Sequence, residues 1–144
     1  MTTLERVTNE IVDLHDFFTE WFNGSVNRDQ LEPRFLSRLH KDLQFIPPEG
    51  FVMSGSALKN GFEQGYGSNP DFRIQIRDVD IRHERDGLVL ATYTEWQTGA
   101  ALSAHANNAR VTTVLMEMTS PITWLHLQET WLPEAVRAAG SFDF

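Results

Sequence analysis

The chain has no cysteine among its 144 residues, which excludes disulfide bonds, thiolate metal ligands and a cysteine nucleophile. No apolar run approaches the roughly 20 residues that a transmembrane helix needs, so we expect no membrane span. The first ten residues, MTTLERVTNE, lack the basic and apolar segments of a secretion signal. These absences predict a cytoplasmic protein.

Basic residues are also scarce. Twelve Lys and Arg against 20 Asp and Glu give a formal net charge of −8. No basic run could follow a nucleic-acid backbone or lie on an anionic membrane surface. We therefore expect neither nucleic acid nor membrane as a partner.

Several catalytic motifs are missing as well. The sequence has no glycine-rich phosphate loop and no serine in a strand-to-helix elbow. The histidines do not show the spacing of a metal site; they are His15, His40, His83, His105 and His126. The sequence therefore predicts no metal and no cofactor.

The residues that are present suit a folded core. Apolar residues make up 41% of the chain, with ten Phe and four Trp. A length of 144 residues is that of one ordinary domain, so we expect residues 1–144 to form a single unit.

The first half of the sequence predicts helices. Thr2 and Glu5 fit a capping box, apolar residues then recur every three or four positions as far as Trp21, and Asn23-Gly24 ends the pattern. A second helix is expected from about residue 29 to residue 39. A third is expected after Ser54 or Ser56, beyond an extended piece at 43–51.

The second half predicts strands. Alternating segments span 72–84, 88–98, 109–119 and 122–132, with turn signals at Asp86-Gly87 and Ser120-Pro121. Helices followed by a strand meander predict an α+β fold, in which the N-terminal helices pack on one face of a curved antiparallel sheet.

Four segments, FRIQIRDVDIR, TYTEWQ, ARVTTVL and WLHLQETWLP, resemble the NTF2-like superfamily of cone-shaped α+β proteins, including its SnoaL-like and DUF4440-type members. The resemblance covers nearly the whole chain and implies a cone with a pocket. The closing strands are also similar to the association domain of calcium/calmodulin-dependent kinases, whose pocket is lined by arginines. The matching positions here are Glu95, Arg110 and Glu129, so two of the three reverse the charge.

Strand parity predicts which side chains meet, because alternate residues share a face. A tight turn at Ser120-Pro121 would pair Met116 with Leu125, Val114 with Leu127, Thr112 with Glu129, and Arg110 with Trp131. In this register Glu129 and Arg110 face the helices. The opposite, convex face would carry a row that we expect to form a homodimer: Val111, Thr113, Leu115, Trp124 and His126.

A cluster of Glu95, Arg110 and Glu129 has a chemical consequence. Two carboxyls around one arginine leave surplus negative charge, so one glutamate is expected to keep its proton and act as a general acid or base. We predict Glu95 and Glu129 as catalytic candidates. The expected ligand-binding residues are Trp21, Tyr93, Arg110, Thr112 and Trp131. Alternatively, Arg110 ties the two glutamates into a purely structural network.

Two functions therefore stay open. The first is a pocket for a small, largely apolar molecule, with isomerase, dehydratase or cyclase chemistry that needs no cofactor. The second is a non-catalytic homodimeric association or binding module. The sequence names no substrate.

Overall fold

A computed structural model describes residues 1–144, beginning with the long helix α1 (Thr3–Asn23). The predicted capping box is present: the Thr2 hydroxyl accepts from the Glu5 N–H, and the Glu5 carboxylate accepts from the Thr2 N–H. Gly24 ends the helix in the left-handed conformation, with a φ of 77° that favours glycine. The buried face of α1 consists of Val7, Ile11, Leu14, His15, Phe17 and Trp21.

The second helix is shorter than predicted. It consists of α2 (Leu31–Arg34) between two single 3₁₀ turns, Arg28–Gln30 and Leu36–Arg38, and the chain is extended from Leu39. Helix α3 (Gly55–Gly65) begins where expected, because the Ser54 hydroxyl accepts from the Ala57 N–H. None of the helices is both long enough and apolar enough to cross a membrane.

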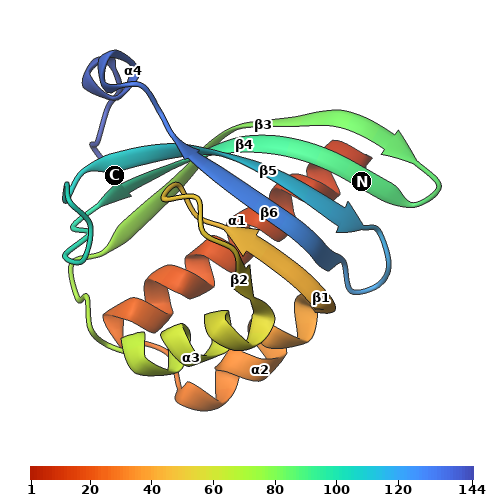
Figure 1. The fold of residues 1–144 in the computed structure, drawn as a ribbon, viewed down its shortest axis with the longest axis horizontal. Helices are drawn as coiled ribbons and strands as arrows, with labels where there is room; N and C mark the ends of the chain where they lie inside the picture. Colours follow the sequence, from red (N-terminus) through yellow and green to blue (C-terminus); the bar gives the residue numbers. More distant parts are fainter.

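Six strands form one curved sheet in the order β2-β1-β6-β5-β4-β3. They are β1 (Leu39–Ile46), β2 (Met53–Ser54), β3 (Arg73–Arg85), β4 (Leu88–Thr98), β5 (Asn108–Glu117) and β6 (Thr123–Trp131). Strand β1 runs parallel to β6, so the sheet is mixed rather than fully antiparallel as predicted. Figure 1 shows α1, α2 and α3 gathered on one side of the sheet, which curves around them.

The register between β5 and β6 decides which side chains face the helices. The predicted pairs Arg110–Trp131, Thr112–Glu129 and Val114–Leu127 are confirmed. The pair Met116–Leu125 is wrong: a bulge at Leu125 pairs Met116 with Trp124 instead. A bulge inserts one extra residue into a strand, so the side chains before it point to the opposite face from the one that simple alternation predicts. Trp124 is consequently fully buried against the helices, and its predicted place on the convex face is incorrect.

The chain ends on the convex side of the sheet. After β6 comes a short helix, α4 (Glu134–Ala139), which the sequence analysis did not anticipate. The tail then packs on Trp96, with the rings of Phe142 and Trp96 5.3 Å apart and the Arg77 guanidinium 4.3 Å from the Trp96 ring. Trp96 is only 5% exposed, so the tail covers one end of the convex face.

Candidate functional site

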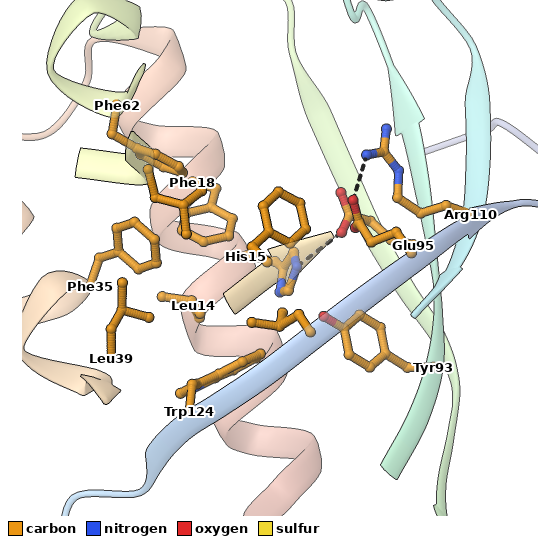
Figure 2. A pocket seen from close by; sticks show the side chains of 14 residues that line it. Leu14, His15, Phe18, Phe35, Leu39, Phe62, Tyr93, Glu95, Arg110 and Trp124 are labelled. Carbon is orange, nitrogen blue, oxygen red and sulfur yellow. Dashed lines mark hydrogen bonds and ion pairs between the residues drawn. The ribbon is translucent and has the colours of Figure 1, made fainter. Parts of the chain in front are cut away.

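A cavity lies between the helices and the concave face of the sheet, partly open to solvent and about 180 Å³ in volume. Ten of its 14 lining residues are apolar. Figure 2 shows its labelled side chains converging from α1, the helices beside it and the strands opposite. An apolar cavity with a few convergent polar groups is the usual form of a small-molecule site.

The apolar end of the cavity is aromatic. Phe18 lies edge-on to Phe35 with ring centroids 4.9 Å apart, and Phe62 lies 5.0 Å from Phe18 and 4.6 Å from Phe35. These three residues come from α1, from the turn after α2 and from α3. The rest of the apolar wall consists of Leu14, Leu39, Phe45, Leu58, Trp124 and Leu127.

The polar end collects four residues from the three central strands. Tyr93 and Glu95 share the concave face of β4, and Arg110 and Glu129 come from β5 and β6. Arg110 is paired directly with Glu95 across one strand boundary and with Trp131 across the other. All four line the cavity, and the two glutamates are buried.

A fifth polar residue, His15, reaches this group from α1. Its Nε2 lies 3.0 Å from Glu95 Oε1, and its Nδ1 lies 2.7 Å from the carbonyl oxygen of Ile11. The ionised Glu95 carboxylate and the Ile11 carbonyl oxygen are both hydrogen-bond acceptors. Only the imidazolium form of His15 donates from both ring nitrogens. The geometry therefore describes a His15 cation bonded to a Glu95 anion, as Figure 2 shows by the dashed line between them.

Arg110 pairs with the other glutamate. Its Nη1 donates to Glu129 Oε1 at 3.1 Å and its Nη2 to Asn108 Oδ1 at 3.0 Å, while its Cζ lies 4.7 Å from the centroid of the Trp131 ring. The Nε atom is buried without a hydrogen-bond partner. Of the expected cluster around Arg110, Glu129 is bonded to Arg110 and Glu95 to His15, while the charges of both glutamates act on Arg110.

The two glutamates have very different pKa values. Burial opposes ionisation of Glu95, but the charge and hydrogen bond of His15 outweigh it and lower the pKa of Glu95 to about 2. Burial, followed by the charge of Glu95, raises the pKa of Glu129 to about 7 in spite of Arg110. Glu129 thus exchanges a proton near neutral pH, while Glu95 stays ionised.

The pKa values of His15 and Tyr93 are both raised. Burial disfavours the His15 cation, but the neighbouring Glu95 carboxylate raises the pKa of His15 above its usual 6.5. Burial and then the glutamates raise the pKa of Tyr93 well above 10, so it stays a neutral phenol. Its hydroxyl points into the cavity in Figure 2. No three His, Asp or Glu side chains converge as metal ligands.

Three of the predicted ligand-binding residues do not line the cavity. Trp21 is buried in the core behind it, where its Nε1 donates to the Phe62 carbonyl at 2.7 Å. Thr112 lies beneath Glu129, with its hydroxyl 3.4 Å from Oε2. Trp131 is 38% exposed and covers the outer side of Arg110. Tyr93 and Arg110, the other two, do line it.

His15 is the polar residue of the cavity that sequence reasoning missed. A signal for it existed, since His15 lies four residues after Ile11 and three before Phe18 and so shares the apolar face of the predicted helix. A buried polar residue on such a face needs a partner. The sequence could not name that partner, because Glu95 is 80 residues further along the chain.

Known protein structures share this architecture. No protein-family model and no curated protein matches the sequence. An NTF2-like protein of unknown function from Pseudomonas aeruginosa superposes with a TM-score of 0.80 at 26% identity, over 89% of this chain and 99% of that one. An NTF2-like protein from Cytophaga hutchinsonii gives 0.69 at 17%, over 92% and 100%. The chain has the NTF2-like fold.

A kinase hub shares the fold as well. The hub of calcium/calmodulin-dependent kinase II from S. rosetta superposes with a TM-score of 0.71, over 92% of this chain and 98% of that one. At 11% identity this likeness concerns the fold alone. The expected cone, and the expected similarity to kinase association domains, are thereby confirmed.

Proposed function

We propose that residues 1–144 form one cytoplasmic domain that binds a small, largely apolar molecule in the cavity and transfers a proton to or from it without a cofactor. The observation that carries the proposal is the pair of glutamates at one end of an apolar cavity, Glu129 with a pKa near neutrality and Glu95 kept ionised. Two carboxyls whose environments separate their pKa values have the properties of an acid–base pair.

Each residue has a stated role. Glu129 gives a proton to, or takes one from, a carbon beside a carbonyl group, as isomerisation, dehydration and aldol cyclisation require. Tyr93, a neutral phenol, donates a hydrogen bond to the developing oxyanion. Arg110 positions the Glu129 carboxyl through its 3.1 Å hydrogen bond, and His15 keeps Glu95 charged.

Proton exchange at carbon tests this function. A cyclic ketone such as cyclohexanone, incubated with the protein in D₂O, is expected to gain deuterium beside its carbonyl faster than in buffer, as NMR would show. The Glu129→Gln variant should still bind the ketone but lose this acceleration. The amide has nearly the same size as the carboxyl group but cannot act as a general acid or base. Equal exchange rates with and without the protein would reject the catalytic role.

We propose in addition that the protein is a homodimer through its convex face. Leu88 and Leu90 on β4 are 40% and 37% exposed there, and Leu115 and His126 lie beside them in register with Leu90. Apolar patches on a sheet face commonly mark interfaces. Solved neighbours that are called a hub and a putative association domain favour the same reading, and a module that only associates is the alternative function.

A further inference from the structure

The charged groups around the cavity are balanced among themselves. Each of its two cations has a carboxylate partner among the lining residues: His15 with Glu95 at 3.0 Å, and Arg110 with Glu129 at 3.1 Å. The side chains of these four residues are 5%, 7%, 12% and 6% exposed, so water does little to screen them. Each charge is therefore matched by an opposite one among the lining residues when Glu129 is ionised, although Arg110 Nε has no hydrogen-bond partner.

A charged ligand would disturb this balance. An anion close to Arg110 would stand beside Glu129 and Glu95, and a cation close to Glu95 would stand beside His15 and Arg110. In either case a charge leaves water for a largely apolar cavity without gaining an unshared partner, which is strongly unfavourable. A neutral ligand meets no such penalty.

The size of the cavity sets a second limit. An engineered cavity of about 150 Å³ in another protein holds one benzene molecule. The present cavity, at about 180 Å³, has room for one six-membered ring and a few further atoms. Two fused rings would exceed it unless the walls moved.

The aromatic end of the cavity provides a binding surface for that six-membered ring. Phe18, Phe35 and Phe62 present a mixture of ring edges and faces, with centroids 4.6 to 5.0 Å apart. Aromatic rings favour such edge-to-face contacts over a direct stack. At the other end, the Tyr93 hydroxyl is a hydrogen-bond donor for an oxygen atom, while Glu129 accepts a hydrogen bond when ionised and donates one when protonated.

We infer that the cavity selects an electrically neutral, single-ring molecule whose one carbonyl or hydroxyl oxygen lies against Tyr93 and Glu129. This inference rests on the proposed function, because it names the ligand class of the same site. It concerns binding alone, and so it can fail while proton transfer at the site stands.

Three probes of nearly identical shape test the selection by charge. Benzamide is neutral, benzoate is an anion and benzamidine is a cation, and all three carry one ring. Titration calorimetry at pH 8, where Glu129 is largely ionised, is expected to give benzamide at least about tenfold tighter binding than either charged probe, because an uncompensated charge is costly to bury. The two-ring probe 2-naphthamide should also bind at least about tenfold more weakly than benzamide, because its second ring lacks space.

A pair of matched variants shows where the probes bind. Leu39→Phe fills the cavity that Leu39 lines, whereas Leu4→Phe makes the same change on the outer side of α1, where Leu4 is 45% exposed. Benzamide binding should be lost in Leu39→Phe and kept in Leu4→Phe. Leu58→Phe, which fills the same cavity from α3, replaces Leu39→Phe if melting shows that the latter does not fold.

The failures can be told apart. If benzoate or benzamidine binds more tightly than benzamide and a filling variant removes that binding, the neutral class is wrong while the cavity stays a binding site. If 2-naphthamide binds as tightly as benzamide in the cavity, the single-ring limit is wrong. If no probe binds at millimolar concentration, the inferred ligand class is rejected. Deuterium exchange into cyclohexanone then tests the proposed function separately.

Discussion

The imidazole of His15 and the carboxylate of Glu95 join the helical layer to the sheet, with 3.0 Å between Nε2 and Oε1. Gln97 donates to the other oxygen of Glu95, and Asn108 donates to Gln97, so the pair belongs to a buried chain of hydrogen bonds. Because His15 keeps Glu95 ionised, the charge of Glu95 acts on Glu129 and favours its protonated form. One helix residue thus determines which strand carboxyl holds the proton.

Replacing His15 should reveal this coupling as lost stability. His15→Leu leaves the buried Glu95 carboxylate without its cation, and losing one partner of a buried pair costs about 3–5 kcal/mol. Urea unfolding at pH 7 measures the change. The double variant His15→Leu with Glu95→Leu should recover much of the loss, because no charge stays unpaired. A single variant as stable as the wild type would contradict the pairing.

Replacing Arg110 should have an effect that depends on pH. Arg110→Met removes the cation beside Glu129 and opposite Glu95, and the part of the penalty that varies between pH 6 and pH 8 falls on the ionised form of Glu129. We expect the loss of unfolding free energy to be greater at pH 8 than at pH 6, where Glu129 takes up a proton. Arg110→Lys, which keeps the charge, serves as the control. An equal loss at both pH values would mean that Arg110 acts through its packing against Trp131 or through the charge of Glu95, and not through Glu129.

The pH dependence of stability follows from the same groups. Glu129 has a folded pKa of about 7 against a usual 4.5, so the folded state binds its proton more tightly, and stability falls as pH rises from about 4.5 to 7. His15, with its raised pKa, contributes stability that is lost as pH rises above 6.5. Glu95, with a pKa lowered to about 2, contributes stability that is lost as pH falls below about 4.5.

The wild type should therefore be most stable near pH 5. Glu129→Gln should flatten the decline between pH 5 and 7 by about 1–3 kcal/mol, because the amide has no proton to lose. Urea unfolding at several pH values measures both curves. A decline of the same size in Glu129→Gln would assign it to other groups.

The convex face gives a prediction about assembly. Leu90→Arg places a charge in the proposed dimer interface and should shift sedimentation towards the monomer at micromolar concentration. Leu4→Arg, the same substitution at an exposed site on α1, should leave the wild-type behaviour unchanged. His126→Gln should weaken the dimer, or change its pH dependence, more than it affects ligand binding. A monomeric wild type would reject the dimer.

Periodicity was sufficient to predict most of the fold and half of the site. The spacing of apolar residues located α1, and parity placed Arg110 and Glu129 on one face, because both signals are local. Parity left the face of Glu95 open, and only the resemblance to kinase association domains assigned it to the same face. Trp124 was misplaced because one bulge at Leu125 reverses the facing of the residues before it, and no residue type marks such a bulge. His15 was missed because its contact crosses between layers, whose relative rotation a strand or helix pattern does not contain.

The protonation of Glu129 is the measurement that tests the account most directly. Carbon-13 NMR of labelled glutamate side chains, titrated from pH 3 to 9 in the wild type and in Glu129→Gln, would follow each carboxyl. The account predicts one resonance that titrates near pH 7 and is absent from Glu129→Gln. If every glutamate of the wild type titrates below about pH 5, as unperturbed carboxyls do, Glu129 is ionised at neutral pH and the proposed acid–base role is contradicted.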